Sequence, residues 1–189
     1  VIFLYLSSIL KITSPHERRM PKSSSGEVIL RMEDKYRKIT NEAKAILWKN
    51  RKEGSVRWNG TNYSYVCPSI EFYPFQWFWD SCFHAIALAH FDINLAKQEI
   101  LNLLSAQHDD GFIPHIIFWG DREIASYWTF LQSKPPYHHS SYIQPPVIAQ
   151  AVKAIFDRCG DNDFLRQTLP QLRRYYLWLQ NRDFDNDGL

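Results

Sequence analysis

The sequence has too few cysteines, and too little net charge, for several common classes of protein. Its three cysteines, Cys67, Cys82 and Cys159, are odd in number and widely spaced among 189 residues. This argues against a disulfide framework and a zinc ribbon, and it favours a reducing compartment such as the cytoplasm. Lys and Arg number 22 against 20 Asp and Glu, a net charge of +2, which predicts no nucleic-acid partner and no anionic membrane surface.

A hydrophobic run long enough to span a membrane is also missing. Residues 1–10 form the apolar stretch, but a span needs roughly 20 such residues. The positive charges Lys11, Arg18 and Arg19 follow this stretch, whereas a signal peptide carries them before it. We expect residues 1–26 to be an unstructured leader or a misassigned start, and a remnant of a targeting or anchor segment is the alternative.

Alternating apolar and polar residues, the mark of a half-buried strand, are absent as well, which argues against β architectures. Residues 51–78 carry Gly54, Gly60, Pro68 and Pro74, so we expect loop there with at most a short hairpin. Apolar residues at three- and four-residue steps predict helices elsewhere. The predicted helices cover residues 33–50, 80–90, 94–106, 121–132, 144–158 and 162–181. Pro170 should bend or split the last of them.

Two stretches share one plan. Residues 80–112 and 144–189 each predict a helix, a short turn, a second helix and then Asp-Gly followed by an apolar residue. Repeated helical hairpins favour an all-α hairpin array or toroid. Such a toroid needs more hairpins than 189 residues supply, and Leu189 follows directly on Asp187-Gly188. We therefore expect residues 27–189 to be the front portion of a larger domain.

Aromatic residues are what the sequence has in excess, at 15% of the chain. They are densest between Phe72 and Trp79, just before a predicted helix, where Trp77 and Trp79 alternate with Gln76 and Asp80. Flat aromatic walls beside carboxylate and amide groups suit a sugar, which presents apolar faces ringed by hydroxyls. Core packing explains Phe75 and Phe78 equally well. Asp80 is also a candidate helix N-cap, and both interpretations remain open.

Two further segments carry candidate pocket residues. His115 follows Gly111-Phe-Ile-Pro and precedes Trp119, and a surface position for this histidine is the alternative. Gln144 precedes two prolines at a predicted helix start, where it either faces a ligand or makes a capping contact.

Metal and cofactor signals are weak. Residues 183–188 match the first half of a calcium loop, but the chain ends before its glutamate, so a polar turn is favoured. His138 and His139 are adjacent and point different ways, which makes them poor ligands for one ion. We predict no metal and no cofactor.

The ordered set Trp77-Phe-Trp-Asp-Ser81, Gly111-Phe-Ile-Pro-His115 and Gln144-Pro-Pro146 resembles the front half of glycoside hydrolase family 63-type domains, in particular the mannosylglycerate and glucosylglycerate hydrolases. The resemblance covers roughly residues 33–189. It implies part of an (α/α)6 barrel and hydrolysis of an α-glycosidic bond with inversion. It also implies a sugar or glycerate pocket, and the residues expected to line it are Tyr73, Trp77, Trp79, Asp80, His115, Trp119 and Gln144.

The chain departs from that family pattern in its catalytic residues. The family's general acid lies in an E-S-G-x-D-N-S-like motif and its general base lies further on, and neither motif is present. We therefore assign no catalytic acid or base. The leading hypothesis is a hydrolase fragment that supplies part of a pocket for a small carbohydrate. The alternatives are a non-catalytic carbohydrate-binding or scaffold remnant, and a toroid module without a carbohydrate role. Exposed helix faces should make the chain self-associate.

Overall fold

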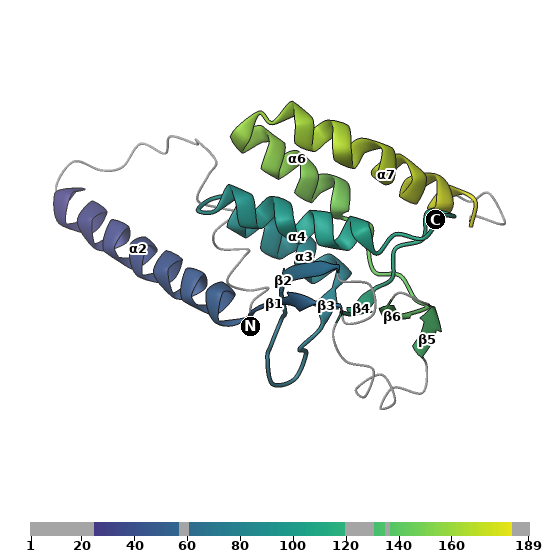
Figure 1. The fold of residues 1–189 in the computed structure, drawn as a ribbon. Coiled ribbons are helices and arrows are strands. Elements are labelled where there is room, and N and C mark those ends of the chain that lie inside the picture. The colour runs from purple at the N-terminus through teal and green to yellow at the C-terminus, as the bar shows by residue number, and fades with distance from the viewer. Residues whose placement is uncertain (1–24, 57–60, 120–130, 135–136, 183–189) are drawn as a thin grey trace. The chain divides into compact units, whose positions relative to one another are not determined.

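The computed structural model describes residues 25–56, 61–119, 131–134 and 137–182 (Figure 1). The chain divides into two compact units, residues 1–49 and 50–189, and each is described by itself. Every helix in the described part of the chain is too short or too polar to cross a membrane.

The first unit contains one long helix, α2 (Ser25–Lys49). It starts eight residues before the predicted helix, and most of the predicted leader lies outside the described residues. Two pairs of opposite charge, Asp34 with Arg37 and Lys38 with Glu42, stand one helical turn apart along its surface. Pairs at this spacing stabilise an exposed helix by a few tenths of a kcal/mol each, roughly 0.2–0.5.

The second unit begins with the short hairpin that the sequence allowed. Strand β1 (Arg51–Ser55) pairs antiparallel with β2 (Asn62–Val66), with Arg51 opposite Val66 and Ser55 opposite Asn62. The inner end of this hairpin is buried, because Tyr65 and Val66 lie in the core.

A second sheet has no counterpart in the sequence prediction. Its antiparallel strands run in the order β3 (Gln76–Trp77), β4 (Ile116–Phe118), β6 (Tyr137–Ser140) and β5 (Leu131–Lys134). Strands of two to four residues are too short to show an alternating pattern, which is why they were missed. The helix predicted over 121–132 is wrong at its end, since Leu131 and Gln132 belong to β5, and its other residues, 121–130, lie outside the described ranges.

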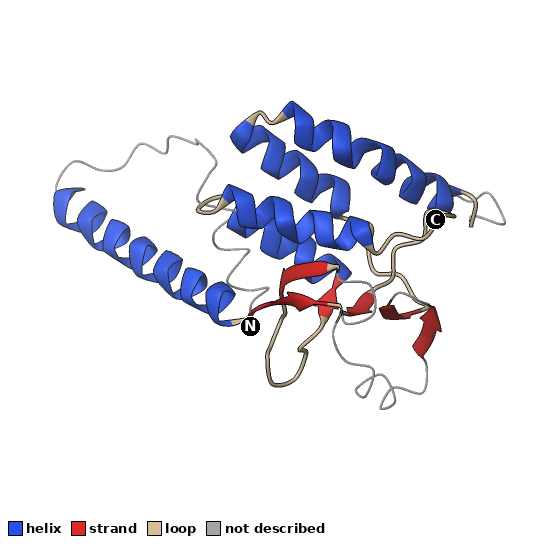
Figure 2. Cartoon of the chain, in the orientation of Figure 1, coloured by secondary structure: helices blue, strands red, loops and turns tan. Residues whose placement is uncertain are grey.

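Four helices form the rest of the unit, and they confirm the two predicted hairpins. They are α3 (Phe78–Leu88), α4 (Ile93–Ser105), α6 (Ile148–Cys159) and α7 (Asn162–Gln180). The Asp92 side chain caps α4 and the Asp161 side chain caps α7, in each case by accepting backbone N–H groups of the first turn. Figure 2 shows these helices stacked together, with the strands gathered along one side of them.

Pro170 neither bends α7 into two pieces nor ends it, so the expected split is wrong. The helix runs through it for 19 residues. Pro170 lies on the exposed side of α7, where water can hydrogen-bond the carbonyl that the proline ring leaves without its N–H partner.

Helix α4 is the centre of the core, because it contacts α3, α6, α7 and β2. Its apolar residues Ile100, Leu103 and Leu104 are at most 1% exposed. The loop after α4 turns at Gly111, which has a φ of +106° and lies so close to the Arg174 carbonyl that a side chain would collide with it. This turn directs the chain back towards residues 112–118 and β4.

Candidate functional site

The first turn of α3 is where most of the sequence-predicted site residues meet. The helix begins at Phe78, and the preceding Trp77 occupies the N-cap position without offering a capping side chain. Asp80 therefore lies inside the first turn and is not the N-cap, which corrects that interpretation of this residue. A carboxylate at this place is still favoured, since the unpaired N–H groups give a helix start a partial positive charge.

Gln144 supplies the cap that Trp77 lacks. Its Oε1 accepts the backbone N–H of Trp79 at 3.0 Å, across 65 positions of sequence. The predicted helix start at Gln144 is wrong, because α6 begins at Ile148 and Gln144 lies in the loop before it. The capping contact that we considered for Gln144 exists, but it is made to α3 and not to its own helix.

An aromatic row, formed by Tyr73, Trp77, His115 and Tyr142, runs past this helix start. Adjacent ring centroids in the row are 5.7, 5.6 and 5.8 Å apart, and each pair meets edge to face. The two outer rings, Tyr73 and Tyr142, are 51% and 58% exposed, while the inner two are half-buried. Three separate segments of the chain thus contribute rings to one aromatic row.

Trp77 carries an unpaired donor within that row. Its indole Nε1 is buried and has no hydrogen-bond partner in the described part of the protein. A buried donor left unpaired costs about 1–3 kcal/mol, so such a group is normally satisfied by an ordered water, an ion or another bound molecule. The other face of Trp77 packs on the small core cluster of Phe75, Ile116 and Phe118.

The Asp80 carboxyl is the acidic group of the site. Burial raises its pKa to about 6, although a hydrogen bond from its own backbone N–H and one from the Trp79 side chain each lower it in part. A carboxyl of this kind is ionised at neutral pH and can accept hydrogen bonds from hydroxyl groups. It is the type of group whose perturbed pKa often marks a functional site.

His115 joins the aromatic row to α3 and to the loop that holds Gln144. Its backbone carbonyl accepts the N–H of Phe78 at 2.9 Å, and its backbone N–H donates to the Tyr142 carbonyl at 3.0 Å. The imidazole Nδ1 contacts the buried hydroxyl of Ser140. Burial lowers the pKa of the imidazole, with the Tyr142 carbonyl opposing part of that shift, so His115 is neutral at neutral pH.

Trp119 is buried in the core. It is 1% exposed, its indole N–H donates to Gln76 Oε1 at 2.6 Å, and its ring stacks on Tyr63 at 6.1 Å. The structure therefore gives Trp119 a place in the core beside Gln76. Its membership of a pocket wall stays a prediction.

Sequence reasoning missed a buried polar group on α4. Glu99 is 0% exposed, and burial raises the pKa of its carboxyl to about 8, against the opposing effect of hydrogen bonds from Ser81, Val66 and Gln76. A signal was present, because Glu99 stands four residues from both Leu95 and Leu103 and so interrupts the apolar side of the predicted helix.

The weak metal signals gain no support. The described residues contain no group of three or more His, Cys, Asp or Glu side chains placed to hold a metal ion. His139 is buried with its Nε2 3.1 Å from that of His108, and residues 183–188 of the half calcium loop lie outside the described ranges.

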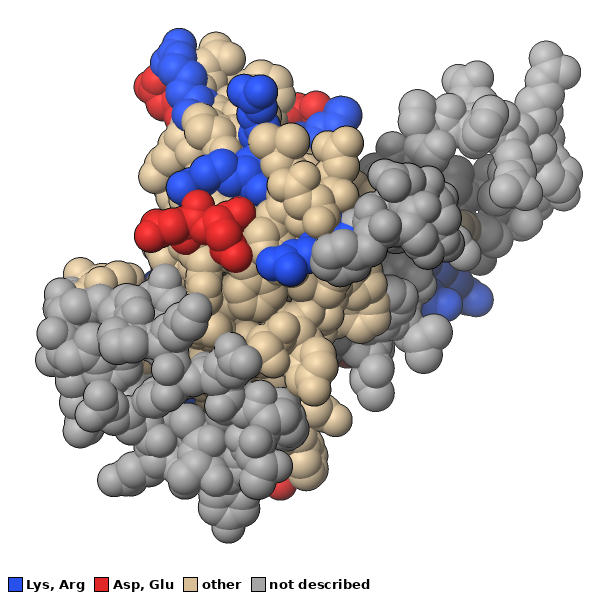
Figure 3. All heavy atoms as spheres, turned by 90° about the vertical axis from the view of Figure 1, so that its right-hand side faces the viewer, with Lys and Arg blue, Asp and Glu red and all other residues tan. Residues whose placement is uncertain are grey.

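Charged side chains of both signs occupy one face of the protein. On the face drawn in Figure 3, basic and acidic side chains are interspersed, and the described residues form no extended patch of one sign there.

Comparison with known proteins agrees with this picture. The family model of the mannosylglycerate hydrolase MGH1-like glycoside hydrolase domain matches residues 73–189. Mannosylglycerate hydrolase MGH2 of Selaginella moellendorffii is 30% identical over 132 residues, which cover 66% of this chain and 27% of the relative. Mannosylglycerate hydrolase of Thermus thermophilus is 32% identical over 145 residues, covering 67% and 32%. Glucosylglycerate hydrolase of Mycolicibacterium hassiacum is 36% identical over 134 residues, covering 61% and 30%.

A solved structure extends the likeness to the fold. The family 63 mannosylglycerate hydrolase from Thermus thermophilus, crystallised with Tris and D-glycerate, superposes with a TM-score of 0.65 at 29% identity. The match covers 79% of this chain and 35% of that one. The helical hairpins described above are thus part of a helical barrel of the family 63 type, as the sequence predicted. The chain spans about a quarter to a third of the length of these relatives.

Proposed function

The chain belongs to the mannosylglycerate hydrolase MGH1-like glycoside hydrolase family, and from that premise we propose that it supplies part of the substrate pocket of an enzyme that hydrolyses a small α-glycoside. We further propose that the glycoside is glucosylglycerate or mannosylglycerate, because the relatives named above are mannosylglycerate and glucosylglycerate hydrolases. Another small α-glucoside is the alternative.

One juxtaposition carries this proposal. The aromatic row presents flat apolar rings, the Trp77 indole offers a buried unpaired N–H, and the Asp80 carboxyl lies in the adjacent helix turn. A sugar ring has apolar C–H faces and a rim of hydroxyl groups, so rings suit its faces and the carboxyl and indole suit its rim. In this arrangement Asp80 binds sugar hydroxyls and does not transfer protons to the glycosidic bond.

The chemistry that we propose for the whole enzyme is hydrolysis with inversion. Inversion needs a protonated acid and an ionised base roughly 6.5–9.5 Å apart, with a water molecule between them. Among the described residues, the carboxyl that we assign to the site is that of Asp80. We therefore propose that residues 27–189 are the front portion of the hydrolase domain, and that both catalytic carboxylates belong to sequence beyond Leu189.

Titration calorimetry with mannosylglycerate, glucosylglycerate and D-glycerate tests the pocket. We expect at least one of these compounds to bind saturably with a millimolar Kd, which corresponds to a binding free energy of about 4 kcal/mol. This binding should be lost in Trp79→Ala. Trp48→Ala is a control, because that tryptophan is half-exposed and belongs to helix α2 of the first unit. Absence of binding at tens of millimolar, or equal binding by Trp79→Ala, would contradict the proposed pocket.

A hydrolysis assay separates the catalytic proposal from its alternative. We expect residues 1–189 alone to release no sugar from mannosylglycerate or from aryl α-glycosides. Turnover that disappears in Asp80→Ala would overturn the placement of the catalytic carboxylates. If an extended chain that continues past Leu189 also binds without turnover, the alternative of a non-catalytic carbohydrate-binding protein takes precedence.

Two further parts of the proposal concern the protein's surroundings. The three cysteines are free thiols, two of them buried, which supports a reducing compartment such as the cytoplasm. Leu169 and Leu177 on α7 are 52% and 45% exposed, which supports self-association of the chain. Sedimentation velocity over a concentration series tests this, and a monomer at all concentrations would contradict it.

A further inference from the structure

Glu99 is a carboxyl group placed in the interior, and among the described residues it forms no ion pair with a Lys, Arg or His side chain. The titratable side chains that face it, Cys67 and Cys82, have thiol pKa values raised mainly by burial and are uncharged at neutral pH. His84, which contacts the Val66 carbonyl, is neutral as well, because burial lowers its pKa to about 4. On β1, the Lys52 ammonium donates to the Pro74 carbonyl at 3.1 Å.

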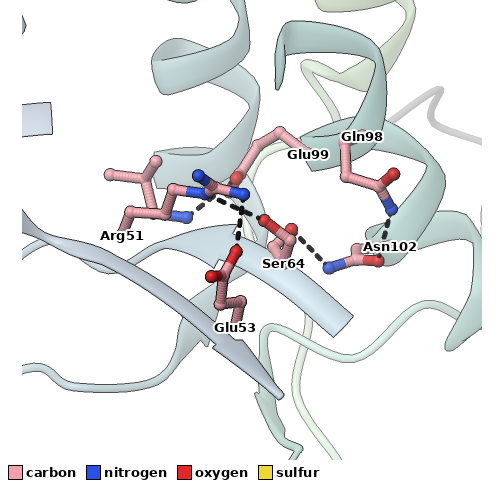
Figure 4. A network of polar contacts seen from close by, with 7 residues as sticks. Arg51, Glu53, Ser64, Gln98, Glu99 and Asn102 are labelled. Carbon is pink, nitrogen blue, oxygen red and sulfur yellow. Dashed lines mark hydrogen bonds and ion pairs between the residues drawn. The ribbon is translucent and has the colours of Figure 1, made fainter. Parts of the chain in front are cut away.

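Burial raises the pKa of Glu99 to about 8, so most of these carboxyl groups are protonated and uncharged at neutral pH, and hydrogen bonds hold the group in place. Oε2 of Glu99 accepts the backbone N–H of Val66 at 2.8 Å, and Oε1 accepts the hydroxyl of Ser81. Figure 4 shows Glu99 reaching from α4 to the hairpin, beside the contacts that join Ser64 to Arg51 and to Asn102. One side chain thus connects α4, β2 and the first turn of α3.

A further contact involves the main chain of Glu99. The Gln76 side chain donates to the Glu99 backbone carbonyl at 3.3 Å. Gln76 and Ser81 are the two residues that flank the segment 77–80, which carries Trp77, Trp79 and Asp80. Both ends of the segment are therefore held by the same residue of α4, while Trp79 and Asp80 themselves remain half-buried at the surface.

We propose that Glu99 is a positioning residue, which fixes residues 77–80 between Gln76 and Ser81 so that Trp79 and Asp80 keep the geometry in which they bind substrate. This inference rests on the proposed function and deepens it, since it adds a residue that acts on the site through others. Two carboxyl oxygens buried in a low-dielectric interior hold their hydrogen-bond donors more tightly than two solvated oxygens do. Glu99 therefore holds Val66 and Ser81 rigidly.

Hydrogen exchange in the unliganded protein tests the positioning role directly. In Glu99→Ala the Ser81 hydroxyl and the Val66 N–H lose their acceptor, so amides of residues 78–82 should exchange about tenfold faster or more. Residues 148–159 of α6 are the internal reference. In Glu99→Gln the amide can still accept from one donor and reach the Ser81 oxygen, so exchange should stay within about threefold of wild type. Glu53→Gln, an exposed residue of β1, is the matched surface control.

Mannosylglycerate affinity is the second readout. We expect Glu99→Ala to weaken Kd about tenfold or more and Glu99→Gln to restore it to within about threefold. Ser81→Ala removes only the hydrogen bond between α3 and Glu99. If Glu99→Ala does not fold, Ser81→Ala should still show the faster exchange over residues 78–82.

Three results would overturn the proposal: unchanged exchange over residues 78–82 in both Glu99→Ala and Ser81→Ala, an equal increase over α6, or a Gln variant as impaired as the Ala variant. A wild-type protein that binds no mannosylglycerate contradicts the proposed function alone, because the exchange measurement needs no ligand.

Discussion

The start of α3 and the middle of α4 each bury a carboxyl group, and the two regions use it in opposite ways. Glu99 is 0% exposed, and its oxygens accept hydrogen bonds from other elements of the fold. Asp80 is only partly buried, and the hydrogen bonds that act on its pKa come from itself and its neighbour Trp79. The interior carboxyl completes the structure, whereas the one at the helix start keeps capacity for a ligand.

The most direct test of this comparison is to remove each carboxyl group in turn and to measure the stability of the two variants. We expect Glu99→Ala to lower the free energy of unfolding by about 3 kcal/mol, because two buried donors lose their acceptor and a cavity remains. Asp80→Ala should change it by less than about 1 kcal/mol. Urea unfolding followed by fluorescence measures both. Equal losses in the two variants would mean that Asp80 is also structural.

For Asp80 the large expected effect is on ligand binding and not on stability. We expect Asp80→Asn to weaken mannosylglycerate binding by about tenfold or more, since a charged hydrogen-bond acceptor contributes about 1.5–3 kcal/mol. Titration calorimetry gives the affinity, and the unfolding curve of the same variant should match that of wild type. Unchanged affinity in Asp80→Asn would remove this carboxyl from the pocket.

The pH dependence of stability sharpens the comparison further. Burial raises the pKa of both groups, from 3.8 to about 6 for Asp80 and from 4.5 to about 8 for Glu99. The folded protein therefore holds these protons more tightly than the unfolded chain, and the stability they contribute is complete below the unfolded pKa and falls as pH rises. Asp80→Asn should remove the fall in stability between about pH 4 and 6. Glu99→Gln should remove the fall in stability between about pH 4.5 and 8. Melting temperatures from pH 4 to 9 test this, and parallel curves for all three proteins would contradict it.

The smallest expected effect concerns the loop that caps α3. Gln144→Ala leaves the Trp79 N–H without its acceptor, which should cost about 1 kcal/mol, as other lost helix caps do. Exchange of the Trp79 amide should accelerate while amides of α4 near Glu99 do not change. Gln150→Ala, at an exposed position of α6, is the control and should alter neither.

The sequence predicted the helices better than the site because the two depend on different ranges of the chain. Periodicity within ten to twenty residues was enough to place α3, α4 and α7 to within two residues. Gln144 capping α3 is a contact across 65 positions, so no local pattern could assign it. Trp77, Trp79 and Asp80 lie together because they are adjacent in the sequence, and their role in a pocket stays a prediction. The sequence could not tell that Trp119 packs inside while Tyr142 lies at the surface.

The order of Glu99 and its partners along the chain has a consequence for biosynthesis. All three donors, on Val66, Gln76 and Ser81, precede Glu99, and the most distant of them is 33 residues away. A nascent chain can thus satisfy this carboxyl as soon as α4 has left the ribosome, before α6 and α7 are synthesised. Short-range contacts close faster than distant ones, so the hairpin, α3 and α4 form the natural folding nucleus onto which the later helices dock.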